Sequence, residues 1–375
     1  MTALRPLFAL LLLAACQPSS TDGKDTDPAS GDTDATTDTT DTDASPDTDA
    51  PTTTPGADFD LNALSAHVYF TGADNQRTVD ADASFPPASE TFESVRLDMK
   101  VSCPAGGRCD PWDRLAWLGV VLDKGTESER VIELTRFITP YGVGDTWSLD
   151  VTDLRPLLTD DVTLRVFIDT WVGPGSSYGD GWQVDAQFVG KGGTPPRNVL
   201  GVLPVYPPTY VVYGDPARSI ATQLPEAVVA LPDGTTRASL RTFVTGHGQG
   251  NAGNCAEFCP KRHALSVGGA EFTQKVWRDN CQSTGAPNQK GSWTYARAGW
   301  CPGAEVLPWV VDVDAPDPTL SVRWDVAPYE NTCRPDSPTC TGCALHTGCE
   351  FDGGTHTEPN YQVGAALIGY GEDAP

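Results

Sequence analysis

Residues 95–114 read VRLDMKVSCPAGGRCDPWDR, an alternating pattern that runs into two close cysteines and a charged tripeptide. Apolar side chains occupy every second position from 95 to 101, which is typical of a strand with one buried face. A small disulfide loop between Cys103 and Cys109 would pin the backbone directly after that strand. The stretch therefore predicts a sheet strand followed by a fixed loop that carries Asp113.

The same two-residue alternation recurs in later segments, and clusters of Gly and Pro separate them. No long stretch shows the 3.6-residue apolar repeat of a packed helix. Many short strands between turns predict an all-β fold of sandwiches or jelly rolls. The clearest alternating segments are 164–169, 182–189, 320–326 and 361–368.

About 315 residues follow the low-complexity N-terminal region, which is more than one hydrophobic core usually serves. The Gly- and Pro-rich stretch 190–208 is the best boundary between two domains. We therefore expect an N-terminal jelly-roll domain over 58–197. A C-terminal one over 198–375 would carry a cysteine-rich insertion near 330–352.

The N-terminus has the pattern of an export signal. Arg5 precedes an apolar run at 7–13, which is too short to span a bilayer but suits a signal peptide. Small residues then lead into Cys16, as in bacterial lipoprotein signals, where acyl chains on the cysteine anchor the mature protein. We expect a signal peptide over 1–15, lipidation of Cys16 and a place in the cell envelope, at the outer membrane. An ordinary secretory signal with a chance cysteine is the alternative.

The segment from Cys16 to residue 57 is nearly all Thr, Asp, Ala, Ser, Pro and Gly. It cannot bury enough apolar surface to offset its ordering entropy, and its repeated Asp charges extend it, so we expect a disordered tether. The whole chain has a formal net charge of −25, and the body beyond the tether is acidic too. Nucleic acid is not expected as a partner, because phosphate binding needs a basic surface.

Ten of the 11 cysteines remain once Cys16 is set aside. An even number in an exported chain indicates disulfides rather than metal ligands. With His346 nearby, the last four cysteines are compatible with zinc, but two local disulfides are the favoured interpretation. These four are Cys333, Cys340, Cys343 and Cys349.

Four short motifs follow one another along the chain: WDR at 112–114, RFITPY at 136–141, CAEFC at 255–259 and RAGWCPG at 297–303. In this order they resemble the peptide-N-glycosidase F family. The resemblance covers most of 60–375 and implies two eight-stranded antiparallel jelly rolls side by side, a fold shared with peptidylglycine hydroxylating monooxygenase. It implies hydrolysis of the amide that links an N-glycan to asparagine. It also implies three disulfides, Cys103–Cys109, Cys255–Cys259 and Cys281–Cys301.

The resemblance further implies which residues form the site. Asp113 matches the principal catalytic aspartate, Glu257 matches a second acid, and Asp169 stands at the position of a third. One carboxylate can accept a proton from water while another, in a different environment, donates one to the leaving nitrogen. We expect Asp113 to handle the water, while Glu257 and Asp169 orient the water and the first sugar. The residues expected to contact substrate are Arg114, Trp112, Trp171, Arg297 and His247.

Purely structural roles are the alternatives for three of these residues. Asp113 could pair with its neighbour Arg114, Glu257 could be a turn residue, and Trp171 could lie in a core. Two positions also depart from the family. Asp169 is one methylene shorter than the family's glutamate, a retreat of about 1.5 Å that can cost roughly a hundredfold in rate. His247 stands where the family has a tryptophan.

Three functions therefore compete. The first is a surface amidase acting on N-glycoproteins or glycopeptides, expected to be a monomer without cofactor or metal. The second is a catalytically weak binder of glycan or protein, which the changes at Asp169 and His247 favour. The third is a copper oxidoreductase of the paired jelly-roll class. Copper sites of that class need clusters of His with Met, and this chain has only five His and two Met, one of them the initiator.

Overall fold

The computed structural model describes residues 53–250, 254–315, 317–332, 350–351, 354–355 and 357–372. The expected signal peptide, Cys16, nearly all of the tether and the four cysteines at 333–349 lie outside the described residues. Within the described part of the chain, no helix is long and apolar enough to cross a membrane.

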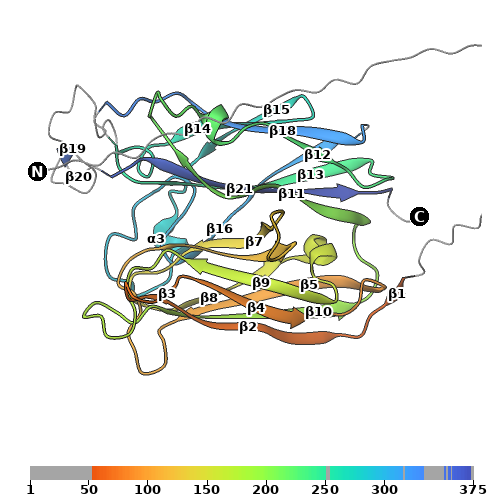
Figure 1. Cartoon of the computed structure of the whole chain (residues 1–375), viewed down its shortest axis with the longest axis horizontal. Helices are drawn as coiled ribbons and strands as arrows, with labels where there is room; N and C mark the ends of the chain where they lie inside the picture. The colour runs from red at the N-terminus through yellow and green to blue at the C-terminus, as the bar shows by residue number, and fades with distance from the viewer. Residues whose placement is uncertain are drawn as a thin grey trace, which may run out of the picture. The chain divides into compact units, whose positions relative to one another are not determined.

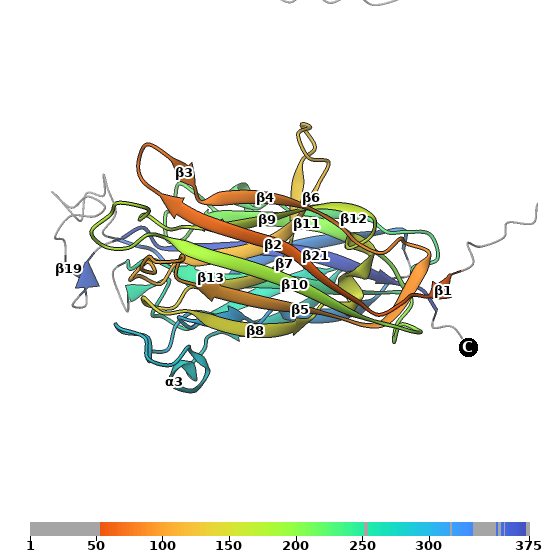
Figure 2. The same cartoon turned by 90° about the horizontal axis from the view of Figure 1, so that it is seen from below.

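The N-terminal half folds into two antiparallel sheets packed face to face. One has the order β8-β5-β10-β2 and the other β7-β6-β9-β4, and Figure 2 shows the first from outside. The strands are β2 (Phe59–Phe70), β4 (Thr78–Ser84), β5 (Glu90–Ser102), β6 (Leu115–Leu122), β7 (Arg130–Ile138), β8 (Asp145–Asp150), β9 (Asp161–Ile168) and β10 (Trp182–Gly192). Short additions are β1 (Thr54–Pro55), β3 (Asn75–Gln76) and the 3-10 helix η1 (Thr152–Leu157).

The C-terminal half forms a second sandwich from the sheets β11-β21-β13-β17 and β12-β18-β14-β15. Its strands are β11 (Val199–Val212), β12 (Ala227–Ala230), β13 (Arg237–His247), β14 (Lys261–Val267), β15 (Ala270–Val276), β17 (Trp309–Asp314), β18 (Thr319–Val326) and β21 (Asn360–Tyr370). Smaller elements are α1 (Ile220–Gln223), α3 (Cys281–Thr284), β16 (Ala304–Val306), β19 (Glu350–Phe351) and β20 (Gly354–Thr355). The predicted all-β fold of two eight-stranded antiparallel sandwiches is confirmed.

Alternation explains why these segments become strands. In β5, Leu97 and Val101 are fully buried while Arg96 and Lys100 face solvent. Leu97 lies opposite Phe188 of β10, which is also fully buried. Burying each such side chain contributes about 1.5–3 kcal/mol, so a register slip that turned this face outward would be strongly disfavoured.

The two sandwiches stack as layers, and polar contacts cross between them (Figure 1). Arg136 of β7 forms a bidentate ion pair with Glu133 at 2.9 and 3.0 Å, and its Nη1 donates to the Gln362 carbonyl of β21 at 2.6 Å. Arg241 of β13 donates to the Glu133 carbonyl at 2.9 Å. A Cβ on Gly364 would lie 2.3 Å from the Glu133 carboxylate, so glycine is needed there.

One strand of the C-terminal half joins the N-terminal sandwich. β16 pairs antiparallel with β7, which places Ala304 opposite Ile138. The RAGWCPG segment leads directly into β16. This pairing brings the arginine of that motif towards the loops that carry the WDR motif.

Candidate active site

Asp110 organises the loop that carries Asp113. Its carboxylate is fully buried and accepts hydrogen bonds from the Trp112 amide at 3.0 Å and the Thr170 hydroxyl at 2.7 Å. It also binds the Arg114 Nε at 2.7 Å. The expected alternative of an Asp113–Arg114 ion pair is therefore wrong, because the Arg114 guanidinium binds Asp110. The Asp113 carboxylate instead lies 3.8 Å from the guanidinium of Arg297.

Glu257 comes from the other sandwich, in the loop between β13 and β14. The disulfide Cys255–Cys259 closes this loop around it. The Glu257 amide donates to the Gly248 carbonyl at 3.1 Å, and its own carbonyl accepts from the Ala298 amide at 2.9 Å. Both bonds fix the backbone, so the direction of the Glu257 side chain is determined by the loop.

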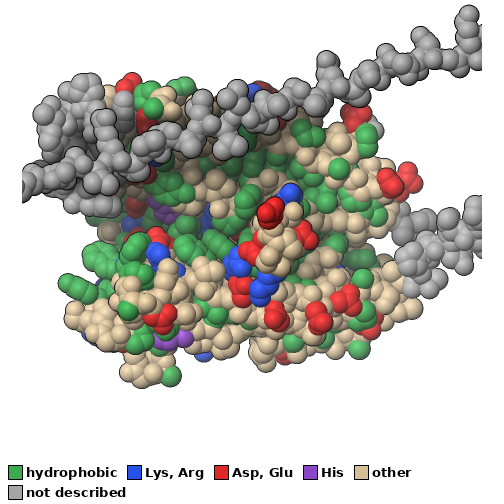
Figure 3. Space-filling view, in the orientation of Figure 1, with side chains coloured by type: hydrophobic (Ala, Val, Ile, Leu, Met, Phe, Trp, Pro, Cys, Tyr) green, Lys and Arg blue, Asp and Glu red, His purple; other side chains and the backbone are tan. Residues whose placement is uncertain are grey.

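Arg297 brings the two acids together. Its Nε lies 3.2 Å from Glu257 Oε1, and its Nη2 lies 3.8 Å from Asp113 Oδ2. The side chain of Arg297 is 1% exposed, against 16% for each carboxylate. Its Nη1 and Nη2 donate to the carbonyls of Tyr295 and Ser292, respectively, each at 2.9 Å. Acids far apart in the sequence thus share one buried guanidinium between the sandwiches, and charged side chains gather along this seam in Figure 3.

Burial and mutual repulsion shift the pKa values of both acids. The pKa of Glu257 rises to about 8, because burial and the negative charge of Asp113 outweigh the attraction of Arg297. Burial also raises the pKa of Asp113, against the opposing effects of the Tyr141 hydroxyl and Arg297. At neutral pH Glu257, with its pKa of about 8, therefore mostly keeps its proton.

Asp169 makes a different ion pair from the one shared by Asp113 and Glu257. Its amide donates to the Leu115 carbonyl at 2.9 Å, which places it where β9 ends beside the start of β6. Its carboxylate is 46% exposed and forms an ion pair with Arg77 at 3.2 Å. Among the contacts of the described residues, none joins Asp169 to Asp113 or Glu257.

Comparisons with known proteins find similarity to one family. Residues 117–177 match the family described as "Peptide-N-glycosidase F, N terminal", and residues 217–332 match its C-terminal counterpart. A peptide-N(4)-(N-acetyl-beta-D-glucosaminyl)asparagine amidase F from Elizabethkingia miricola is 33% identical over 243 residues. That alignment covers 61% of this chain and 66% of the amidase, slightly under two thirds of its length.

Solved structures extend the similarity over both sandwiches. PNGase F, described as a glycosylasparaginase from Flavobacterium meningosepticum, superposes with a TM-score of 0.68 at 25% identity, covering 84% of this chain and 96% of that one. The chain is a peptide-N-glycosidase F-like protein. PNGF-II, at 16% identity and a TM-score of 0.62 over 85% of this chain and 66% of that one, shares the fold.

His247 of this peptide-N-glycosidase F-like protein packs behind the acids. Its ring stacks on Trp300 at 5.2 Å, and the guanidinium of Arg297 lies 4.8 Å from the Trp300 ring centre. Its Nε2 lies 2.9 Å from the Thr245 hydroxyl. Burial, together with the charges of Arg136 and Arg297, lowers the pKa of His247 to about 3, so the ring is neutral. His247 and Arg297 thus both pack against the Trp300 ring.

Both predicted tryptophans of the peptide-N-glycosidase F-like site are exposed. Trp112 is 55% exposed and Trp171 is 54% exposed, so a core position for Trp171 is wrong. The ring centres of Trp171 and Phe70 lie 5.2 Å apart in an edge-to-face arrangement. The guanidinium carbon of Arg77 lies 4.4 Å from the centre of the Trp171 ring. Large aromatic surfaces held open by their neighbours are suited to stacking against a ligand ring.

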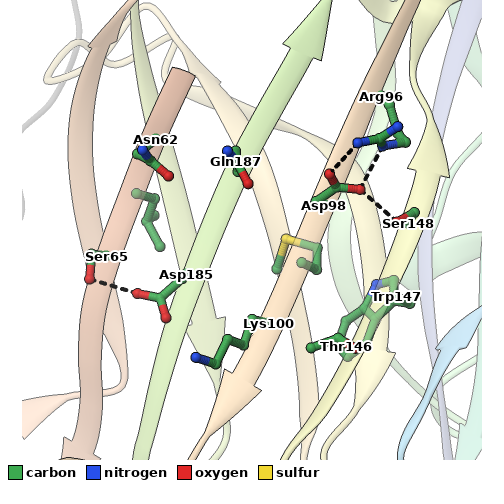
Figure 4. A pocket seen from close by; sticks show the side chains of 12 residues that line it. Asn62, Ser65, Arg96, Asp98, Lys100, Thr146, Trp147, Ser148, Asp185 and Gln187 are labelled. Atoms are coloured by element: carbon green, nitrogen blue, oxygen red, sulfur yellow. Dashed lines mark hydrogen bonds and ion pairs between the residues drawn. The ribbon is translucent and has the colours of Figure 1, made fainter. Parts of the chain in front are cut away.

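A recess on the protein surface lies elsewhere. It opens on the outer face of β2, β10, β5 and β8 (Figure 4). Its polar side chains bind one another, as in the ion pair of Arg96 with Asp98 and the hydrogen bond from Ser65 to Asp185. Charged groups of the recess that already pair with one another offer little to a charged ligand, and the recess contains neither Asp113 nor Glu257. We therefore place the site at the acids joined by Arg297.

Sequence reasoning assigned no role to three residues that the structure places at the site or beside it: Asp110, Tyr141 and Arg77. Tyr141 could have been found, because it ends the RFITPY motif, and its hydroxyl interacts with Asp113. Asp110 precedes the WDR motif, where any acid is equally compatible with a turn. Arg77 had no signal, because it lies far from the motifs in sequence. Within the part of the chain that the structure describes, no cluster of three or more His, Cys, Asp or Glu could hold a metal ion.

Proposed function

We propose that this protein is an amidase that hydrolyses the bond between an N-glycan and asparagine in glycoproteins or glycopeptides. The observation that carries the proposal is the pair of acids, Asp113 and Glu257, held by one buried guanidinium of Arg297. Burial raises the pKa of both, and because that of Glu257 rises to about 8, we assign the acid role to Glu257 and the base role to Asp113. The amidase F relative, named for this reaction, supports the choice of substrate.

In the proposed mechanism, ionised Asp113 accepts a proton from a water molecule as the water attacks the amide carbonyl carbon. The resulting tetrahedral intermediate collapses with cleavage of the carbon–nitrogen bond. Protonated Glu257 donates its proton to the leaving nitrogen, which departs as a glycosylamine and leaves aspartate in the peptide. Asp113 returns its proton to Glu257 through solvent, and the site is restored.

Arg297 acts in this scheme by holding the acids in place. Its Nε and both terminal nitrogens already bind protein oxygens, from Glu257, Tyr295, Ser292 and Asp113. Three of its five N–H groups are thus committed to hydrogen bonds within the protein, which fixes the guanidinium between the two acids. Its positive charge opposes the effect of burial on the pKa of Asp113 and on that of Glu257.

The three disulfides of the structure indicate an exported protein. We further propose that lipidated Cys16 anchors it in the cell envelope, at the outer membrane, with 16–57 as a tether. We propose 58–197 and 198–375 as its two domains and a monomer as its active form. Radiolabelled palmitate should enter the wild-type chain in bacteria and be lost from Cys16→Ala.

A glycan-binding protein without appreciable turnover is the second candidate. The ion pair of Asp169 with Arg77 favours it, because a paired and half-exposed carboxylate is poorly placed for proton transfer. Incubation with a denatured N-glycoprotein separates the two. The amidase releases the intact glycan and converts asparagine to aspartate, which mass spectrometry detects, whereas a binder changes neither.

Asp113→Asn should lower the rate of glycan release by about 10²–10⁴-fold, the usual contribution of a general base, with an unchanged melting temperature. Asp185→Asn is the matched control, since Asp185 bonds Ser65 on the outer sheet and lies in the recess of Figure 4. Release by Asp113→Asn at the rate of Asp185→Asn would remove Asp113 from the mechanism.

A further inference from the structure

We propose that Arg77 is a positioning residue that fixes Asp169 and Trp171 as one rigid wall, and that this wall selects a neutral sugar ring. The inference rests on the proposed function, because it gives the wall a place beside the amide that is cleaved. It adds a residue that no motif of the sequence marks.

The Arg77 side chain makes four contacts at this wall. Its Nη1 lies 3.2 Å from Asp169 Oδ1, and its Nε donates to Asn75 Oδ1 at 2.9 Å. Its guanidinium carbon lies 4.4 Å from the ring centre of Trp171 and 5.0 Å from that of Phe70. A planar guanidinium can bind a carboxylate along its edge and stack on an aromatic face at once, which an ammonium group cannot.

The backbone holds the same unit together. The Arg77 carbonyl accepts from the Ile168 amide at 3.0 Å, directly before Asp169. The Phe70 amide donates to the Val172 carbonyl at 3.0 Å, directly after Trp171. The hairpin around β3 and the end of β9 are therefore joined on both sides of the wall. Arg77 connects the two segments through its side chain.

The wall offers a sugar two kinds of contact. Trp171 presents about half of its surface to solvent, and Asp169 presents a carboxylate that is 46% exposed. A carboxylate accepts and a guanidinium donates, which together suit neighbouring ring hydroxyls, while the indole face suits the apolar side of the ring. Since Asp169 and Arg77 cancel each other's charge, the wall fits a neutral ring better than a charged one.

The wall also stands near the proposed reaction centre. The Asp169 amide bonds the carbonyl of Leu115, two residues after Asp113. A ring held against Trp171 is therefore presented beside the loop that carries the proposed base. Holding a substrate equally in its ground and transition states changes KM and leaves kcat nearly unchanged.

The test compares steady-state kinetics of glycan release from a neutral N-glycopeptide. Arg77→Met, which keeps an apolar stem and loses the guanidinium, should raise KM by about tenfold with kcat within about twofold. Arg77→Lys should recover little of this loss, because it lacks the planar fork. Asp169→Asn breaks the pair from the other side and should raise KM similarly.

Asp169→Glu gives the sharpest expectation. The extra methylene moves the carboxylate by about 1.5 Å, past the guanidinium that now binds it, so KM should rise. Arg165→Met is the matched control, since Arg165 forms a comparable ion pair with Asp80 on the same sandwich, at 2.6 Å, without an aromatic partner. It should change neither constant by more than about twofold.

The outcomes are decisive. An unchanged KM in Arg77→Met and Asp169→Asn, with only a lower melting temperature, would reduce Arg77 to a structural tether. A lower KM for a glycopeptide sulfated on its inner sugars than for the neutral one would overturn the neutral selectivity. If the wild-type protein releases no glycan, the proposed function fails by itself. The wall is then tested by calorimetric binding of the same glycopeptide, and equal affinity of wild type and Arg77→Met overturns it.

Discussion

Glu257→Gln should make the protein more stable at alkaline pH while it removes the proposed proton donor. Gln resembles the protonated form of the side chain, so it keeps the buried geometry without the charge. In the wild-type protein, burial and the charge of Asp113 disfavour ionised Glu257 and raise its pKa to about 8. The folded state therefore keeps a proton that the unfolded state releases.

The magnitude follows from the difference in pKa between the two states. The usual value for Glu is 4.5 and the folded value is about 8, which corresponds to a free-energy difference on the order of 5 kcal/mol. A raised folded pKa gives a contribution that is fully present below pH 4.5 and is lost as the pH rises through 8. Stability of the wild-type protein should thus fall across this window relative to Glu257→Gln.

Urea unfolding between pH 5 and pH 9 measures this effect. The free energy of unfolding of Glu257→Gln minus that of the wild type should grow with pH and level off above about 8. Glu129→Gln is the control, because the Gly125 amide and Arg165 lower the pKa of Glu129, so its effect on stability should be constant over this range and change only at lower pH. A difference between Glu257→Gln and wild type that stays constant across the pH range would refute the raised pKa and, with it, Glu257 as proton donor.

Two further changes test what joins the molecule. Glu133→Gln removes the charge that pairs with Arg136 between the sandwiches, so the free energy of unfolding should fall by about 3–5 kcal/mol. A decrease below about 1 kcal/mol would contradict a buried ion pair at this position. Replacing Cys281 and Cys301 by Ala opens a loop of sequence separation 20 and should cost about 3 kcal/mol, measured by urea unfolding; an unchanged midpoint would mean that the loop is held by β16 alone.

The local signals in the sequence were strong where a residue pattern has one physical meaning. Alternation over 95–101 predicted a strand with one buried face, and β5 has it. The resemblance supplied the paired sandwiches and the acids Asp113 and Glu257. It could not supply the orientation of the Arg114 side chain, because Asp110 and Asp113 are both within its reach.

The contacts that join distant segments could not be predicted. The structure pairs Asp169 with Arg77, which precedes it by 92 residues and which no motif of the sequence marks. The stacking of His247 on Trp300 likewise joins residues 53 positions apart. Such contacts depend on side-chain directions and loop positions, which no sequence period encodes.

By itself, the amino-acid sequence determined the strands, the loops that carry the acids and the export pattern of the N-terminus. These follow from local rules, since alternation, turn residues and cysteine spacing act over a few residues. Only the tertiary structure brought Arg297 between Glu257 and Asp113, at 3.2 and 3.8 Å. Their pKa shifts exist because folding removes both acids from water and places them close together, and neither condition exists in the unfolded chain.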